Sequence, residues 1–310
     1  MALHIETPLL ASPSLSAAAG RTVWLKLESL QPSGSFKLRG IGVACETYVR
    51  QGKLRFISSS GGNAGIAVAY AGSRLSIPVT VVVPESTTAR AKALIRQYGA
   101  EVIVHGTAWD DANALALSML GDDAVLLHPF DDPLLWSGHA TLVDEVARSH
   151  VRPGAVVLSV GGGGLLAGVV EGLRRNGWDD VPVIAVETVG ADSLAQSLDA
   201  GRRVTLDAIT SVAKSLGARQ VSEQAFAVAQ SHPVRSVVVP DSAALAACER
   251  LLDEHRILVE PACGASLALA YDRADVLAPY DNVLIVVCGG ATATVDDLRR
   301  WAQPSISGGA

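Results

Sequence analysis

Residues 158–173, LSVGGGGLLAGVVEGL, combine an apolar run, four consecutive glycines and an apolar pattern of helical spacing. This order predicts a buried strand, a tight loop and a helix. Because glycine has no Cβ, the backbone N–H groups of such a loop can surround an oxyanion. We therefore expect the loop to bind a phosphate, with a purely structural glycine turn as the alternative.

Short apolar runs and helix-like patterns alternate on both sides of this segment. Strands are expected at 79–83, 102–104, 156–160, 183–186, 234–239 and 283–287, and helices at 87–98, 109–120, 243–253 and 263–274. This alternation favours an α/β fold with mainly parallel sheets covered by helices on both faces. A length of 310 residues fits two such sheets, and PFDDP at 129–133 is the predicted crossing between them.

The composition excludes several classes of protein. With 49% hydrophobic and 18% charged residues, the chain can bury a large core, which excludes intrinsic disorder. A net charge of −6 argues against nucleic acid and anionic membranes as partners. The uncharged run 153–170 is rich in glycine and is interpreted as a strand and loop rather than a membrane span. The low-complexity tail at 305–310 is expected to be mobile.

The N-terminus and the cysteines predict a cytoplasmic protein. Residues 1–8 contain neither a basic region nor a long apolar region, so no secretory signal is expected. The cysteines form no C-x-x-C pair, and reduced thiols are expected rather than a disulfide framework or a zinc site. They are Cys45, Cys248, Cys263 and Cys288.

Two further loops carry side chains suited to chemistry. SGSFKLRG at 33–40 contains Lys37, an amine that desolvation would make nucleophilic; the alternative is a solvated surface lysine. SSSGGNAG at 58–65 precedes a helix-like run, and a helix N-terminus together with the Asn63 amide suits a carboxylate. An ordinary N-cap with a glycine turn is the alternative there. Because ligands of open α/β sheets bind at the carboxyl ends of strands, all three loops are expected to follow strands and face one cleft.

A dinucleotide-binding loop is a competing interpretation of the glycine run. Gly162, Gly164 and Ala167 match G-x-G-x-x-A, and Glu187 ends a later expected strand. A nicotinamide-dependent dehydrogenase would follow from that match. It leaves the other two loops without a role.

Taken together, several segments resemble the serine dehydratase/threonine deaminase family of fold-type-II pyridoxal-phosphate enzymes. They occur in family order across nearly the whole chain and are QPSGSFKLRGIG, SSSGGNAGIAVAYA, PFDDPLLWSGHATLVDE, LSVGGGGLLAGVVEGL, VPVIAVETVGADS, ITSVAKSLGA, ILVEPACGASLA and LIVVCGG. The resemblance implies a fold like that of the tryptophan synthase β subunit, with two domains that each hold a mainly parallel twisted sheet flanked by helices. The small domain would span 33–133, and the large one 1–32 together with 134–310.

The resemblance also implies a role for each site residue. Lys37 would be the catalytic Schiff-base lysine and the base at the substrate Cα. Phe36 and Ser215 would lie on the two faces of the cofactor ring, Asn63 would contact its hydroxyl and Cys288 its nitrogen. The cofactor phosphate would be held by Gly161, Gly162, Gly163, Gly164 and Leu165. The substrate carboxylate would be held by Ser60, Gly61, Gly62 and Asn63.

Cys288 carries information about the reaction. An aspartate at the ring nitrogen would keep that nitrogen protonated and the ring a strong electron sink. A thiol, with an ordinary pKa of about 8.5, is a weaker proton partner, which favours β-elimination over transamination. The implied activity is conversion of L-serine to pyruvate and ammonia, and of L-threonine to 2-oxobutanoate and ammonia.

Further expectations follow from the family pattern. A monovalent cation, usually potassium, would be held by the backbone carbonyls of Gly161, Ala191, Leu216 and Ala218. The chain would act on a small amino acid as a homodimer. Gly61 replaces an alanine of the main serine dehydratases, and the missing methyl is expected to widen the site beside the substrate.

Other functions, on the same fold or of another class, stay open. A serine racemase would need an acid on the opposite face of the substrate, for which Ser60 is the candidate. A cysteine-synthase-like transferase and a silent amino-acid-binding module are also considered. His128, His139 and Glu187 are interpreted as packing or supporting residues, Arg39 as an anchor of the turn after Lys37, and Phe130 as either a wall of the site or part of a crossing turn.

Overall fold

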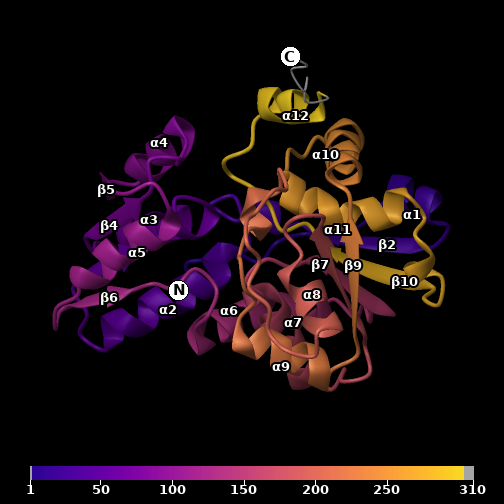
Figure 1. Ribbon diagram of the computed structural model, residues 1–310. Coiled ribbons are helices and arrows are strands. Elements are labelled where there is room, and N and C mark those ends of the chain that lie inside the picture. Colours follow the sequence, from indigo (N-terminus) through magenta and orange to yellow (C-terminus); the bar gives the residue numbers. More distant parts are fainter. Residues whose placement is uncertain (1, 304–310) are drawn as a thin grey trace, which may run out of the picture.

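The computed structural model describes residues 2–303, so the tail at 305–310 lies outside the described residues. The larger sheet has six strands (Figure 1). Its first strand pairs antiparallel with the second, and all other pairs are parallel. In spatial order the strands are β1 (Leu9–Ala11), β2 (Thr22–Lys26), β10 (Asn282–Val286), β7 (Ala155–Ser159), β8 (Val183–Thr188) and β9 (Val234–Val239).

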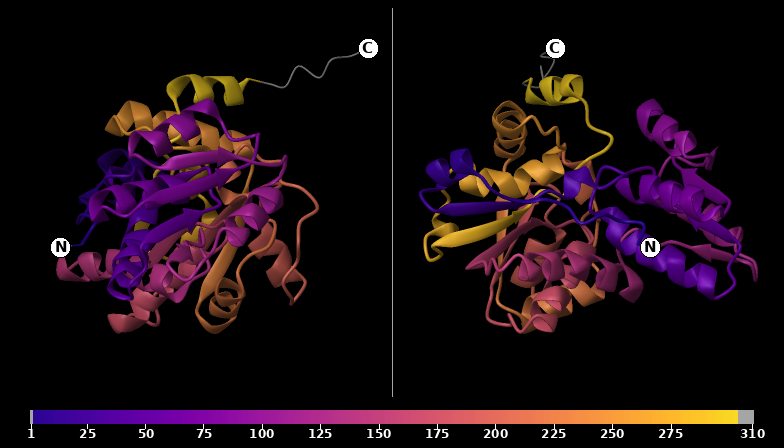
Figure 2. Two further views of the ribbon diagram at one scale, coloured as in Figure 1. Left: turned by 90° about the vertical axis from the view of Figure 1, so that its left-hand side faces the viewer. Right: turned by 180° about the vertical axis from the view of Figure 1, so that it is seen from behind.

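Helices cover both faces of this sheet (Figure 2). One face carries α1 (Pro13–Ala19), α10 (Asp241–His255) and α11 (Pro261–Tyr271). The other carries α6 (Pro133–Arg148), α7 (Gly164–Arg175), α8 (Ser193–Asp199) and α9 (Glu223–Ser231). Helix α12 (Val295–Ala302) follows the last strand and packs on α10. Strands β7 and β8 are buried along their whole length, as expected for valine-rich strands covered on both faces.

The smaller sheet has four parallel strands and lies in the lobe at the left of Figure 1. Their spatial order is β5 (Glu101–Val104), β4 (Val79–Val83), β3 (Arg55–Ser58) and β6 (Ala124–Leu126). Helix α5 (Trp109–Ser118) packs on one face, with Ala112 and Ala116 against Ile57 and Val82. The other face is covered by α2 (Lys37–Arg50), α3 (Asn63–Leu75) and α4 (Ala89–Gln97).

Every strand and helix predicted from the sequence is present, with ends that differ by a few residues. The pattern did not predict four strands. Three are short or atypical: β6 has three residues, β3 begins with an arginine, and β1 is an exposed edge. The fourth is β2, a five-residue strand that ends in the buried Lys26. The expectation that each glycine-rich loop follows a strand is wrong for the first loop, because the 3₁₀ helix Glu28–Leu30 intervenes after β2. The run 153–170 forms β7, its loop and the start of α7. Among residues 2–303, no helix combines the length and the apolar character that crossing a membrane requires.

A buried cluster of four charged residues joins α2 to the larger sheet. The Arg39 guanidinium donates to both oxygens of Glu28 at 2.7 Å and to both oxygens of Glu145 at 2.6 and 2.7 Å. Lys26 of β2 donates to the same Glu145 carboxylate. Two cations therefore balance two carboxylates in the interior, where an unpaired charge would be costly.

Removal of the Arg39 guanidinium should destabilise the fold strongly. Arg39→Met leaves Glu28 and Glu145 with one remaining cation, and we expect a loss of about 3–5 kcal/mol in the free energy of unfolding, measured in urea. Arg152→Met is the matched control, because the Arg152–Asp180 pair lies on the surface and its loss should hardly move the unfolding midpoint. Equal midpoints for the two variants would contradict the role given to the buried cluster.

Candidate active site

One cavity brings the three loops together. It is lined by residues from the start of α2, the start of α3 and the loop between β7 and α7. The sequence-predicted residues that line it are Phe36, Lys37, Asn63, Gly161, Gly162, Gly163, Gly164, Leu165, Ser215 and Cys288. Leu216 lines it as well, whereas Ser60, Gly61, Gly62, Ala191 and Ala218 are not among its lining residues.

Lys37 is the first residue of α2 and directs its amine into the cavity. The Nζ donates to the backbone oxygen of Pro129 at 2.6 Å and lies 5.1 Å from the centre of the Phe36 ring. Burial of the amine lowers the pKa of Lys37 to about 8, and Cys288 and Glu260 oppose this shift. An amine in this setting is not a solvated surface group. It holds a substantial unprotonated fraction near neutral pH.

The tetraglycine loop combines a turn with close packing. Gly163 has φ +90°, a conformation that residues with a Cβ rarely adopt. A Cβ on Gly162 would lie 2.3 Å from the Phe130 ring, so the PFDDP segment packs directly on the loop. Gly164 then opens α7, whose first N–H groups have no partner within the helix. The loop therefore packs closely against the PFDDP segment and presents unpartnered N–H groups at the start of α7.

Asn63 opens α3 and connects parts of the chain that are distant in sequence. Its Nδ2 donates to Oε1 of Glu260 at 2.8 Å, and its Oδ1 accepts from the backbone N of Ala291 at 3.1 Å. The N-cap residue Gly62 makes no side-chain capping bond. A glycine therefore caps α3, as the N-cap alternative expected. Because glycine has no capping side chain, the N–H groups of the first turn are also available to an anion.

The sulfur of Cys288 lies in the same cavity, directly after β10. Cys288 is buried, and its contact with Cys263, together with burial, raises the pKa of its thiol well above the usual value. The group stays a neutral thiol over the physiological pH range. Such a group offers a ring nitrogen no strong proton partner.

Sequence reasoning missed Glu260. This glutamate is buried and lines the cavity beside Cys288. Burial raises the pKa of its carboxyl to about 7, against the lowering effects of Ser215, Asn63 and Lys37. The available signal was an acidic residue in the apolar segment ILVEPACG, next to a helix-opening proline.

The prediction that Gly61 widens the site beside the substrate is wrong. A Cβ on Gly61 would lie 2.7 Å from Cγ2 and 2.8 Å from Oγ1 of Thr87, and 3.2 Å from Val83. The missing methyl therefore opens no space beside the cavity, because the Thr87 side chain fills it. Alanine at this position would have to displace Thr87 or the loop.

His128 and Glu187 accept hydrogen bonds from the backbone, whereas His139 contributes packing. The Nδ1 of His128 accepts from the backbone N of Phe130 and of Asp131 and so fixes a turn. Both oxygens of Glu187 accept from backbone N–H groups at the start of α8. His139 is buried, with its ring centre 4.9 Å from that of Phe36.

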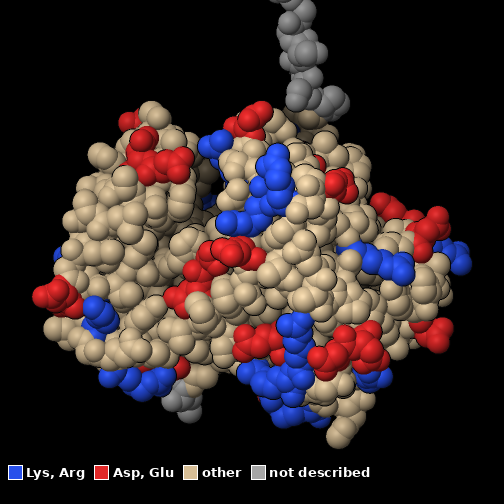
Figure 3. Space-filling view, turned by 60° about the horizontal axis from the view of Figure 1, so that its bottom comes forward, with Lys and Arg blue, Asp and Glu red and all other residues tan. Residues whose placement is uncertain are grey.

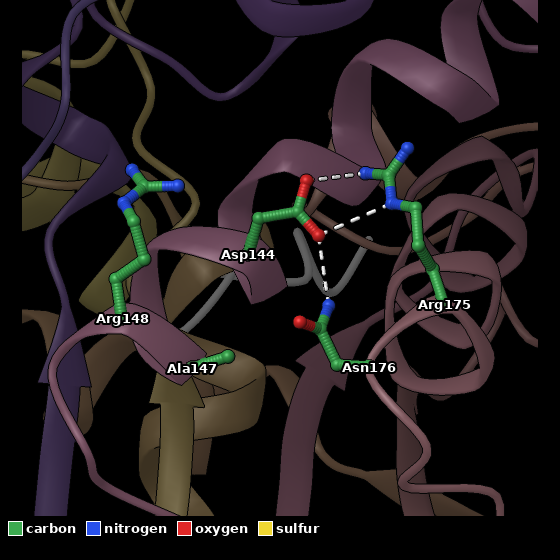
Figure 4. A pocket seen from close by; sticks show the side chains of 5 residues that line it. All are labelled: Asp144, Ala147, Arg148, Arg175 and Asn176. Carbon is green, nitrogen blue, oxygen red and sulfur yellow. Dashed lines mark hydrogen bonds and ion pairs between the residues drawn. The ribbon is translucent and has the colours of Figure 1, made fainter.

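The second hollow described among residues 2–303 is shallow and lined by surface charges. Figure 3 shows acidic and basic side chains interspersed over one face of the molecule. In a shallow hollow formed by α6 and α7, Asp144 accepts from Arg175 and Asn176 (Figure 4). Arg148 beside it pairs with Glu6. Within residues 2–303, no cluster of three or more His, Cys, Asp or Glu side chains is placed to hold a metal ion.

The cavity fits pyridoxal phosphate. It contains a buried amine of lowered pKa and a glycine loop at a helix N-terminus. It also contains the buried Oγ of Ser159, which has no hydrogen-bond partner among the described residues and can meet a polar ligand. Together with two helix-covered sheets, these features define a cofactor-binding α/β enzyme.

Comparison with known proteins agrees with this class. A family model described as "Pyridoxal-phosphate dependent enzyme" matches residues 2–289, and the chain belongs to this family. It is 46% identical to human "L-serine dehydratase/L-threonine deaminase" over 97% of this chain and 95% of that protein. It is 49% identical to human "Serine dehydratase-like" over 96% of this chain and 93% of that protein.

The comparison with solved structures gives the same fold. The structure of an L-serine ammonia-lyase from Rhizomucor miehei superposes with a TM-score of 0.93 and 35% identity, covering 97% of this chain and 98% of that chain. The fold is therefore that of the fold-type-II pyridoxal-phosphate enzymes, and the dehydrogenase alternative is wrong.

The lowered pKa of Lys37 can be tested in cofactor loading. The unprotonated amine is the nucleophile, so the rate at which cofactor-free protein takes up pyridoxal phosphate should rise with pH through about 8. Borohydride reduction followed by peptide mapping should place the cofactor on Lys37 and not on Lys26, Lys53, Lys92 or Lys214. Attachment to another lysine, or a rate that rises only toward pH 10.5, would contradict this assignment.

The packing at Gly61 predicts a paired effect. Gly61→Ala should destabilise the protein by about 1–3 kcal/mol through overpacking against Thr87, and it should change the ratio of activities on L-serine and L-threonine. Thr87→Ala in the same chain removes both close atoms and should restore most of the stability. The effect is measured by the melting temperature and the L-serine to L-threonine activity ratio of both single variants and the double variant. A double variant no more stable than Gly61→Ala would exclude Thr87 as the obstacle.

Proposed function

We propose that this chain is a lyase that eliminates water from L-serine to release pyruvate and ammonia, and converts L-threonine in the same way to 2-oxobutanoate and ammonia. The observation that carries the proposal is the arrangement of the cavity. The Lys37 amine, the N-terminus of α3 and the tetraglycine loop surround one space. The names of the relatives described above support L-serine and L-threonine as the substrates.

Each step of the reaction can be assigned to residues of the chain. Bound pyridoxal phosphate supplies the electron sink for the breaking Cα–H bond. The first backbone N–H groups of α3, that of Asn63 among them, hold the substrate carboxylate and so orient Cα toward Lys37. The unprotonated Nζ of Lys37 takes the Cα proton, and the carbonyl of Pro129 holds that amine in place at 2.6 Å. The neutral Cys288 thiol leaves the ring nitrogen without a strong acid, which favours prompt loss of the β-hydroxyl. The hydroxyl would leave as water with the proton that Lys37 has taken from Cα.

A racemase is the alternative that uses the same fold. It needs a proton donor on the face opposite Lys37. Ser60 does not line the cavity, and its Oγ lies 3.4 Å from the backbone N of Gly62. Elimination is therefore the favoured outcome.

We also propose that the protein binds a monovalent cation and forms a homodimer. The cation would be a potassium ion held by the carbonyls of Gly161, Ala191, Leu216 and Ala218. Two of these residues lie close together, because a Cβ on Gly161 would be 3.0 Å from the Cα of Leu216. The Leu216 carbonyl accepts from the backbone N of Ala218 at 2.8 Å and would have to be shared with the ion. We also propose a homodimer in the cytoplasm, a location that the free state of all four cysteines supports.

Turnover of L-serine tests the function directly. The purified protein with pyridoxal phosphate and potassium should release pyruvate and ammonia in equal amounts, faster than with lithium in place of potassium. Lys37→Ala should lower the rate at least a thousandfold because the base is lost, and the exposed Lys53→Ala should not change it. Recovery of D-serine without pyruvate would show a racemase instead.

A further inference from the structure

We propose that Glu260 is a positioning residue that fixes the amide of Asn63 and thereby sets which end of that amide faces the cofactor. The inference rests on the pyridoxal-phosphate site described above. Glu260 precedes α11 and its side chain is buried. Its Oε1 accepts the hydrogen bond from Nδ2 of Asn63 at 2.8 Å.

The two partners of Asn63 dictate its orientation. A backbone N–H can only donate, so Ala291 requires Oδ1 on its side. The Glu260 oxygen that faces Asn63 accepts its hydrogen bond, which places Nδ2 on the other side. One hydrogen of Nδ2 is then left for the cofactor. Without Glu260, the amide would lose the partner that holds this donor in place.

Glu260 also joins segments that belong to different sheets. Asn63 opens a helix on the smaller sheet, whereas Gly290 follows β10 of the larger sheet. The backbone N of Glu260 donates to the Gly289 oxygen at 3.4 Å, and a Cβ on Gly290 would lie 2.5 Å from the Glu260 Cγ. The carboxyl therefore holds the start of α3 against the loop that carries Cys288.

The surroundings argue against a role as the base of the reaction. Lys37 already presents an amine to the cavity, and the Glu260 carboxyl is engaged by Asn63 and lies against Ser215. Glu260 acts through Asn63, so the acceptor oxygen is what matters, and the negative charge is not required. A glutamine can supply that oxygen, whereas a methionine of similar size cannot.

Two substitutions at Glu260 separate these roles. Glu260→Met should move the absorbance band of the bound cofactor, recorded without substrate, and lower kcat about 10- to 100-fold with little change in KM. Glu260→Gln should restore the band and most of kcat. The proposal is overturned if Glu260→Gln behaves like Glu260→Met, or if neither variant differs from the parent.

A double variant and a control variant complete the experiment. Asn63→Ala and the double variant Asn63→Ala, Glu260→Met should be equally impaired, because Glu260 acts through Asn63. Multiplied losses in the double variant would overturn the proposal. Glu187→Met is the matched control, since Glu187 is a buried carboxyl outside the cavity; it should lower the melting temperature without moving the cofactor band. Because the band needs no substrate, this test stands even where L-serine is not the substrate.

Discussion

The ion pairs of Arg39 are the constraint on which the placement of Lys37 depends. Arg39 lies two residues after Lys37 on α2, and its guanidinium binds Glu28, which follows β2, and Glu145 of α6. Breaking one partner of such a buried pair leaves an uncompensated charge, so the cluster penalises arrangements that separate these elements. Burial alone would raise the pKa of Glu145, but Arg39 and Lys26 outweigh it and hold that pKa below its ordinary value. The start of α2, and with it Lys37, is fixed by this requirement.

Close packing of backbone against backbone shapes the cavity between the two sheets. The tetraglycine loop lies beneath the Phe130 ring at a distance that leaves no room for a Cβ on Gly162. The carbonyl of the neighbouring Pro129 accepts the Lys37 amine. The segment that crosses from β6 to α6 thus forms one wall of the site. The absence of a Cβ at Gly162 is therefore a requirement of packing.

Burial in the cavity shifts the pKa values of its titratable groups toward their neutral forms. Burial lowers the pKa of Lys37 to about 8 and raises that of Glu260 to about 7, while the Cys288 thiol is held neutral. An amine that loses its proton near physiological pH suits the removal of a Cα proton. A neutral thiol suits a cofactor ring that passes electrons on to a leaving group instead of storing them.

The α/β class, most of the central strands and the three loops follow from local sequence patterns, because apolar periodicity, glycine and proline act locally. The sequence also singled out Lys37, Asn63 and Cys288, since the order of several motifs resembles one enzyme family. The tertiary structure decided what depends on distant partners. Glu260 became a site residue only when its carboxyl met Asn63, and the space beside Gly61 proved to be filled by Thr87. Such contacts join segments far apart in the chain, and no local pattern encodes which side chains meet across a folded interior.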